Sequence, residues 1–312
     1  LLQKITNGKW DVTDFYGYDA TKKIFYYQAA QVSPMGREIY AVDLKGKQTR
    51  ILEGTGTNVS IFNKTFSYFV SLTETANKVP QISMRTASGK SLYVIENNST
   101  FSEKLKTLPL AKKEFIQIKN AEGILLNAWK ILPQNFDAFK KYPVVVMQYS
   151  GPCFQFVLDE FDYGWEQYLA TQGFVVIGVD VRGSDGRGEV FRKSTYLQLG
   201  QLEAKDLCDV AHYLAAQSYI DNNRIGIYGW SYGGYAVLMT MSQPNSLYKA
   251  GVAVAPVTDW KLYDTAYTER YMRTPQDNFR GYALSSPIEL ADKLQGRLLL
   301  VHGTADDNVH LQ

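Results

Sequence analysis

Residues 224–237 read RIGIYGWSYGGYAV, and this stretch determines how the second half of the chain is interpreted. An apolar run from Ile225 to Tyr228 leads into a glycine-rich turn that carries Ser231, and small residues that permit a helix follow. The G-x-S-x-G spacing is that of a nucleophile elbow, in which a strand turns sharply into a helix and exposes the serine Oγ on a strained backbone. The first N–H groups of such a helix can stabilise an oxyanion. A chance serine in a strand-to-helix turn is the alternative, and the flanking patterns favour a nucleophile.

Apolar runs typical of strands buried on both faces alternate with helical segments around this turn. We expect strands at 142–149, 173–179, 225–228, 251–255 and 297–301, helices at 165–171 and 202–217, and an earlier strand pair at 115–118 and 125–132. This alternation predicts a parallel, doubly wound sheet of the α/β-hydrolase kind. The reactive site of such a sheet lies beyond the carboxyl ends of its strands. The loops predicted to surround one site therefore follow Tyr149, Asp180, Gly229, Ala255 and His302.

The first hundred residues contain short segments rich in aromatic and β-branched residues, which predict strands at 10–18, 24–30, 38–44, 48–52, 59–62, 66–72, 81–86 and 92–95. The hairpin at 39–52 matches the hairpin at 82–95 with a constant offset of 43 residues, and a Gly-Lys pair lies at each turn. A four-strand unit that recurs at this interval is typical of a β-propeller blade. We therefore expect a partial propeller of about two blades at 1–110, before an α/β domain at 111–312. A small β-sheet module is the alternative, since two blades cannot close a ring.

Composition narrows the classes of function. The 312 residues are 45% hydrophobic and 21% charged, which is typical of a globular protein. A net charge of +2 gives no argument for nucleic acid as a partner, and no apolar run approaches the ~20 residues that span a bilayer. The cysteines, Cys153 and Cys208, are expected to be buried free thiols. Neither belongs to a cluster with metal-ligand spacing, so no metal site is predicted.

A candidate triad acid follows the last predicted strand. Asp306 and Asp307 lie just past that strand, and an α/β-hydrolase has its acid after the serine in chain order. Aspartates at such a position also cap the helix that follows a loop. The residues alone decide neither between these roles nor between the two aspartates.

The candidate bases are the three histidines, His212, His302 and His310. His212 lies in a predicted helix, where a structural role is expected. His310 lies close to the acid but precedes any further strand whose loop would deliver an imidazole over Ser231, so we interpret it as a structural or rim residue. A triad imidazole must reach both the serine and the carboxylate. We therefore expect the catalytic histidine beyond Gln312.

Six motifs, in order, resemble the dipeptidyl peptidase IV-like serine exopeptidases of the prolyl oligopeptidase family. They are YSGPC at 149–153, VDVRGSDGRG at 179–188, GWSYGGY at 229–235, APVTDW at 255–260, YTERYM at 267–272 and HGTADDNVH at 302–310. The resemblance is strong over the last two hundred residues. The first hundred residues resemble, more loosely, the final blades of the family's eight-bladed propeller.

The resemblance implies a role for individual residues. It makes Ser231 the nucleophile, Asp306 the triad acid, and the hydroxyl of Tyr149 with the backbone N–H of Tyr232 the oxyanion hole. It implies no cofactor. The residues that match the family's substrate-binding positions are Tyr232, Val257, Trp260, Tyr263, Tyr267 and Val309 for the proline pocket, Asn308 for the carbonyl of the preceding residue, and Arg270 near the substrate's N-terminus.

The implied activity is release of N-terminal Xaa-Pro or Xaa-Ala dipeptides, by an enzyme that acts in the periplasm, the cell envelope or outside the cell and that can form a homodimer. Within the family, the histidine and the acidic pair that grips the substrate's amino group lie on segments that this sequence does not match. We therefore expect a chain cut at both ends, with a hydrolase domain incomplete at its C-terminus and inactive by itself. Alternative hypotheses are a tripeptidyl or acylaminoacyl peptidase, and a non-catalytic binding protein with a hydrolase fold.

Overall fold

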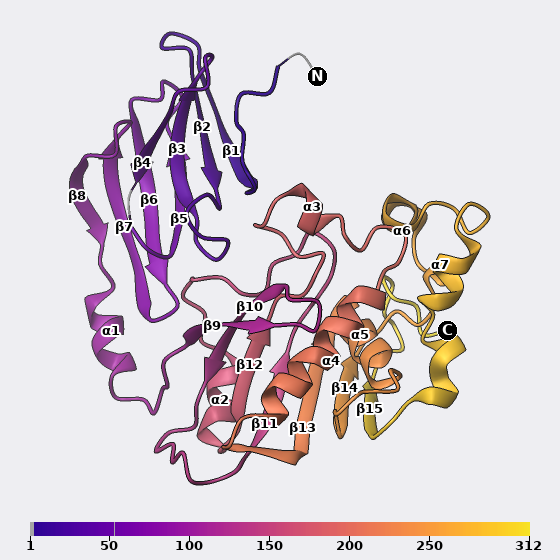
Figure 1. The fold of residues 1–312 in the computed structure, drawn as a ribbon. Helices are drawn as coiled ribbons and strands as arrows, with labels where there is room; N and C mark the ends of the chain where they lie inside the picture. The colour runs from indigo at the N-terminus through magenta and orange to yellow at the C-terminus, as the bar shows by residue number, and fades with distance from the viewer. Residues whose placement is uncertain (1–2, 53) are drawn as a thin grey trace. The chain divides into compact units, whose positions relative to one another are not determined.

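The computed structural model describes residues 3–52 and 54–312, which form two compact units (Figure 1). The first unit contains the residues up to Lys112 together with two short later segments, Leu158–Gly164 and Asp185–Val190. The second unit contains Lys113–Val157, Trp165–Ser184 and Phe191–Gln312. No pattern in the sequence indicated that two short segments of the later half would join the first unit.

The first unit consists of two four-stranded antiparallel sheets with strands in chain order, which is the blade arrangement that the repeat predicts. The first sheet contains β1 (Val12–Asp19), β2 (Ile24–Ala29), β3 (Glu38–Asp43) and β4 (Gln48–Leu52), and the second contains β5 (Thr57–Phe62), β6 (Tyr68–Thr75), β7 (Lys78–Thr86) and β8 (Ser91–Glu96). All eight strands lie where the sequence predicts them, within a few residues.

The matched hairpins turn in the same way. Gly46 has φ 83° and Gly89 has φ 89°, in the left-handed region where glycine has no side-chain penalty. The bond from the Asp43 N–H to the Lys47 carbonyl has its counterpart in the bond from the Thr86 N–H to the Lys90 carbonyl. The 43-residue offset therefore reflects a repeated structure.

One helix of the first unit has no counterpart among the predicted elements. Helix α1 (Ser99–Leu105) lies between the strands predicted at 92–95 and 115–118, where the sequence predicts no regular element. None of its residues is buried, so its sequence has no apolar stripe from which a helix could be predicted.

The second unit is built on a seven-stranded sheet in the order β15-β14-β13-β11-β12-β10-β9. Five strands run parallel, β11 (Tyr142–Met147), β12 (Val175–Val179), β13 (Ile220–Trp230), β14 (Ala250–Val254) and β15 (Arg297–Val301), and the hairpin of β9 (Glu114–Lys119) and β10 (Leu125–Ile131) adds antiparallel strands at one edge. The predicted α/β-hydrolase sheet is confirmed.

Helices α4 (Gln201–Ala215) and α5 (Tyr232–Met241) pack together beside β13 and β14, and their side chains join those of the strands in one hydrophobic core (Figure 1). Helix α2 (Trp165–Thr171) packs on β12. The remaining helices are α3 (Glu189–Arg192), η1 (Trp260–Leu262), α6 (Thr265–Met272), α7 (Phe279–Leu284) and η2 (Ile288–Lys293).

Two burial predictions are wrong. Strand β15 is not buried on both faces: among the described residues its paired strand is β14, and Leu299 is 57% exposed. An apolar groove of about 780 Å³ lies on this sheet and is lined by residues that include Tyr228, Val252 and Arg297. Cys208 is buried as expected, but Cys153 is exposed.

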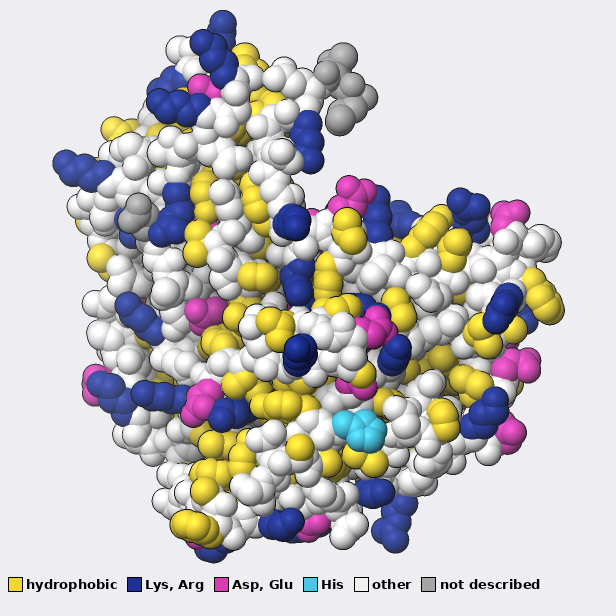
Figure 2. Space-filling view, in the orientation of Figure 1, with side chains coloured by type: hydrophobic (Ala, Val, Ile, Leu, Met, Phe, Trp, Pro, Cys, Tyr) yellow, Lys and Arg dark blue, Asp and Glu magenta, His cyan; other side chains and the backbone are white. Residues whose placement is uncertain are grey.

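The surface mixes charges of both signs. Figure 2 shows Lys and Arg side chains interspersed with Asp and Glu on the face drawn. Over the described ranges, 3–52 and 54–312, no helix has both the length and the apolar character that crossing a bilayer requires.

Candidate active site

The turn that carries Ser231 has the strained geometry of a nucleophile elbow. Strand β13 ends at Trp230, helix α5 begins at Tyr232, and Ser231 between them has φ 57° and ψ −118°. A non-glycine residue in this region is strained, and the surrounding structure must hold it there. The Ser231 N–H donates to the Val254 carbonyl at 2.8 Å, which ties the elbow to the end of the neighbouring strand.

Close backbone approach explains the glycines of this turn. A Cβ on Gly233 would lie 2.8 Å from the Gln148 carbonyl oxygen, and a Cβ on Gly229 would lie 2.2 Å from the Gly233 carbonyl oxygen. The Gln148 side chain also donates to the Gly233 carbonyl at 2.9 Å. The elbow is therefore seated against the end of β11, the strand that leads into Tyr149.

Tyr149 and Tyr232 lie side by side at this seat, with ring centroids 6.2 Å apart. Tyr149 is half-buried, and Phe154 packs on it with a centroid distance of 4.5 Å. Tyr232 is the first residue of α5, and the first N–H groups of a helix have no acceptor within that helix. The structure thus brings together the two residues that the resemblance assigns to an oxyanion hole.

Strands β13, β14 and β15 are consecutive parallel neighbours, so their carboxyl ends lie on the same side of the sheet. The loop after β15 therefore carries Asp306 on the side where β13 leads into Ser231. Asp306 Oδ1 accepts the N–H groups of Asn308 at 3.0 Å and Val309 at 2.9 Å, and these bonds hold the pKa of its carboxyl below the usual value. The structure describes no helix between Val301 and Gln312, so these bonds close a turn of the loop and do not cap a helix. The described residues supply no hydrogen-bond partner for Oδ2, which stays available to orient another group. Asp307 is exposed.

Among the described residues, none of the three histidines has a hydrogen bond that a triad base would make. His212 Nε2 is 3.1 Å from the Asn245 carbonyl oxygen on the flank of α4, as its structural interpretation predicts. His302 Nδ1 is 3.1 Å from the Gly303 carbonyl oxygen, and His310 is exposed. Within residues 3–52 and 54–312, no histidine hydrogen bonds to the Ser231 side chain.

The predicted proline-pocket residues form one aromatic cluster. The Trp260 ring lies 5.5 Å from Tyr232 and 5.9 Å from Tyr267, onto which it stacks at 20°, while Tyr263 meets both Trp260 and Tyr267 edge to face. The Asp264 carboxylate caps α6 by accepting the Tyr267 N–H at 2.8 Å, which fixes the start of the helix that carries this ring.

Val257 and Val309 complete the cluster and are 4% and 7% exposed. A cavity of about 20 Å³ adjoins them and Tyr263, which is room for about one water molecule. The aromatic surfaces are thus assembled and closely packed.

The two polar residues assigned to substrate contacts, Asn308 and Arg270, are both exposed. The Tyr263 hydroxyl donates to Asn308 Oδ1 at 3.2 Å, so the Asn308 NH₂ group is left to donate in another direction. Arg270 is exposed on α6 next to Tyr271; burial raises the pKa of the Tyr271 phenol, and the Arg270 charge opposes that rise.

Two buried carboxylates on α4 escaped the sequence analysis. Glu203 and Asp206 are both fully buried. The Tyr232 hydroxyl donates to Glu203 Oε1 at 2.7 Å, so Glu203 touches the elbow itself. A signal existed: Glu203 precedes Leu207 by four residues and Asp206 precedes Val210 by four, so both carboxylates occupy positions of the apolar stripe.

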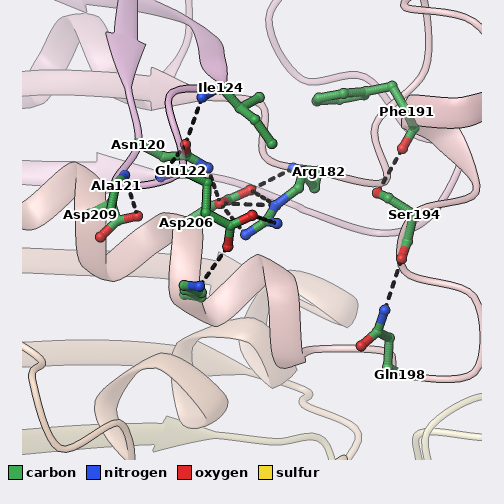
Figure 3. A network of polar contacts seen from close by, with 11 residues as sticks. Asn120, Ala121, Glu122, Ile124, Arg182, Phe191, Ser194, Gln198, Asp206 and Asp209 are labelled. Carbon is green, nitrogen blue, oxygen red and sulfur yellow. Dashed lines mark hydrogen bonds and ion pairs between the residues drawn. The ribbon is translucent and has the colours of Figure 1, made fainter.

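Asp206 is the centre of a polar network that fixes α4 (Figure 3). Arg182, on the loop after β12, binds the Asp206 carboxylate through its backbone N–H at 2.9 Å, its Nε and its Nη2. Asn120 donates to the same carboxylate at 2.8 Å, and Arg182 also pairs with Glu122 at 2.9 Å. No set of three or more metal-ligating side chains is found in the part of the chain that the structure describes.

A strained serine at a strand-to-helix turn of a mostly parallel sheet, with an acid loop two strands away, defines the class of α/β-hydrolases. Two family models agree: residues 160–312 match the prolyl oligopeptidase family, and residues 1–80 match the N-terminal region of dipeptidyl peptidase IV, which is a β-propeller. The chain belongs to the prolyl oligopeptidase family and to its dipeptidyl peptidase IV-like members.

Among solved structures, dipeptidyl peptidase 4 of Porphyromonas gingivalis is 46% identical with a TM-score of 0.96, over 99% of this chain and 44% of that one. A putative dipeptidyl aminopeptidase IV from Bacteroides ovatus is 30% identical with a TM-score of 0.89 over the same shares. Dipeptidyl aminopeptidase B of Saccharomyces cerevisiae is 36% identical over 99% of this chain and 41% of its own length. The chain thus spans less than half the length of these relatives.

Proposed function

We propose that this chain is part of a serine exopeptidase that releases dipeptides ending in proline or alanine from the N-terminus of peptides. The observation that carries the proposal is the strained Ser231, which directly precedes Tyr232, a residue of the aromatic cluster whose ring lies beside Tyr149. A cluster of rigid rings suits a pyrrolidine ring, because both are rigid and little conformational entropy is lost on contact.

In the proposed reaction the Ser231 Oγ attacks the carbonyl carbon of the second residue, and the bond from that carbon to the nitrogen of the third residue breaks. The remaining peptide leaves as an amine that takes up the proton lost by Ser231, and water then hydrolyses the acyl-enzyme to release the dipeptide. The Tyr149 hydroxyl and the Tyr232 N–H donate to the oxyanion that develops in each step. Asp306 stays ionised at neutral pH, because backbone N–H groups lower the pKa of its carboxyl, and its Oδ2 orients the imidazole that takes the serine proton.

Two polar groups fit the rest of a dipeptide. The Asn308 NH₂ group donates to the carbonyl between the first two residues, since Tyr263 fixes the opposite end of the amide. Arg270 lies exposed where it contributes to holding the substrate's N-terminal part.

A panel of chromogenic substrates tests the specificity. The full-length enzyme is expected to hydrolyse Gly-Pro-p-nitroanilide faster than its N-acetylated form by about tenfold to a hundredfold, because a blocked amine loses a charge-assisted hydrogen bond worth ~1.5–3 kcal/mol. Ala-Ala-Pro-p-nitroanilide serves as the tripeptidyl control. Faster hydrolysis of that substrate or of acetyl-Ala-p-nitroanilide would assign the site to the tripeptidyl or acylaminoacyl alternative, and no hydrolysis of any substrate would favour a binding protein.

The 312-residue chain by itself is expected to be inactive. None of its three histidines hydrogen bonds to the Ser231 side chain in the described ranges, and loss of a triad member costs several powers of ten in kcat. Incubating the purified chain with Gly-Pro-p-nitroanilide, beside the full-length enzyme at equal concentration, measures this. Comparable rates would show that one of these histidines is the base.

A further inference from the structure

A buried carboxyl group lies directly behind the nucleophile turn. Glu203 has no exposed surface, and its only side-chain partner in the described residues is the Tyr232 hydroxyl, at 2.7 Å. The second oxygen, Oε2, is buried with no hydrogen-bond partner in the same ranges. A buried ionised carboxylate normally gathers several donors, so this arrangement suits the uncharged acid better than the anion.

The partner of Glu203 is a central part of the site. Tyr232 follows Ser231 directly, is 2% exposed, and has its ring against Tyr149 and Trp260. The hydroxyl is the polar group of that ring, so its hydrogen bond to Glu203 fixes the position of the ring within the aromatic cluster. The backbone N–H assigned to the oxyanion hole belongs to the same residue, one tyrosine side chain away from the carboxyl.

The helix that carries Glu203 is itself held rigidly. Three residues further along α4, the Asp206 carboxylate accepts the backbone and guanidinium donors of Arg182 (Figure 3). Glu203 therefore cannot follow the tyrosine by movement of the helix. A change at the carboxyl is instead passed to the Tyr232 ring.

We propose that Glu203 is a positioning residue for the nucleophile turn, that it works in its uncharged form, and that its ionisation lowers the reactivity of Ser231. The inference rests on the proposed function, since it assumes that Ser231 is the nucleophile. A negative charge on Glu203 would be separated from the developing oxyanion by the side chain of Tyr232 and would raise the energy of the transition state. The low dielectric of the aromatic cluster screens this repulsion little.

The surroundings place this ionisation near neutral pH. Burial raises the pKa of Glu203 to about 7; the Tyr232 hydroxyl and N–H groups at the start of α4 oppose the rise, and the Asp206 charge adds to it. The other titratable groups that face Glu203 are Tyr232 and Tyr235 on α5 and Tyr267 on α6, and burial keeps all three phenols protonated by raising their pKa.

The test compares the full-length wild type with Glu203→Gln, Tyr232→Phe and the control Glu289→Gln, an exposed glutamate on η2. The readout is the rate at which a fluorophosphonate labels Ser231 between pH 5.5 and 9, because labelling needs the serine and its oxyanion donors but no dipeptide specificity. The amide that Glu203→Gln introduces mimics the uncharged acid. The ratio of the Glu203→Gln rate to the wild-type rate is expected to be near one at pH 5.5 and to rise severalfold above pH 7.

A ratio that does not change with pH would overturn the proposal, whereas the Glu289→Gln ratio is expected to stay flat. Tyr232→Phe is the second arm and decides the matter if Glu203→Gln does not fold. Removing the only side-chain donor raises the pKa of Glu203 further, so the alkaline decline in labelling should move to higher pH, and an unmoved decline would contradict the proposal. Labelling with this pH dependence but without release of dipeptides would contradict the proposed function and leave the role of Glu203 supported.

A thermal measurement separates positioning from simple stability. The pKa of Glu203 is about 7 in the folded protein and 4.5 in the unfolded chain, so between these pH values the folded state binds more protons than the unfolded state. The stability of the wild type therefore falls as pH rises from about 4.5 through about 7. The Tm of Glu203→Gln should lack this fall. A labelling ratio that only tracks the fraction unfolded at the assay temperature would overturn the positioning role.

Discussion

Replacing Ser231 with alanine in the full-length enzyme is expected to lower kcat for Gly-Pro-p-nitroanilide by about a millionfold, the loss typical of a serine nucleophile acting within a triad. The other parts of the site stay in place, because the Ser231 N–H still donates to Val254 and the aromatic cluster is formed by other residues. Substrate binding should therefore survive. Stopped assays with product detection down to the uncatalysed rate measure the loss.

A matched control is available in the same unit. Ser246 is 9% exposed, and no described residue pairs with its hydroxyl, so Ser246→Ala removes a hydroxyl at little cost to stability or activity. Turnover by Ser231→Ala within tenfold of the wild type would remove Ser231 from the mechanism. Equal losses in both variants would show damage to the fold instead.

The sequence predicts the strands of this protein well because each one carries a local pattern. The matched hairpins and their turn glycines, Gly46 and Gly89, repeat a structure whose hydrogen bonds are local, so spacing alone reveals it. The elbow is equally local, since strand, strained serine and helix occupy a single stretch around Ser231.

The remainder depends on contacts between distant residues. Sequence does not indicate the order of the strands in the sheet, because that order is set by crossover connections that apolar runs do not encode. Asp306 is distinguished from Asp307 by backbone bonds that the folded loop makes and by its lower exposure. Glu203 and Asp206 occupy positions of the apolar stripe of α4, but only the fold brings their partners, Tyr232 and Arg182, to them.

The second large effect concerns stability. Asp206→Asn in the full-length protein is expected to destabilise the second unit by about 3–5 kcal/mol, because it leaves the Arg182 guanidinium buried without its main counter-charge. The replacement keeps the shape of the side chain and an oxygen that can accept from Asn120, so loss of charge dominates. The urea midpoint at which fluorophosphonate labelling of Ser231 disappears reports on this unit.

Glu122→Gln is the contrasting variant, because Glu122 also pairs with Arg182 but has a side chain 41% exposed. Exposed ion pairs contribute ~0–1 kcal/mol, so this variant should move the midpoint little. Equal shifts in Asp206→Asn and Glu122→Gln would contradict the assignment of Asp206 as the main counter-charge.

Replacing both partners, as Arg182→Met with Asp206→Leu, removes the unpaired charge together with the pair. Apolar residues of similar volume often substitute for a buried ion pair at no cost, so the double variant should recover much of the stability lost in Asp206→Asn. Its labelling rate should nevertheless stay below that of the wild type. Arg182 and Asp206 fix α4 through directional bonds that apolar side chains do not replace, and α4 carries the carboxyl that holds Tyr232. Full recovery of both stability and labelling would show that the network contributes nothing to the geometry of the nucleophile turn.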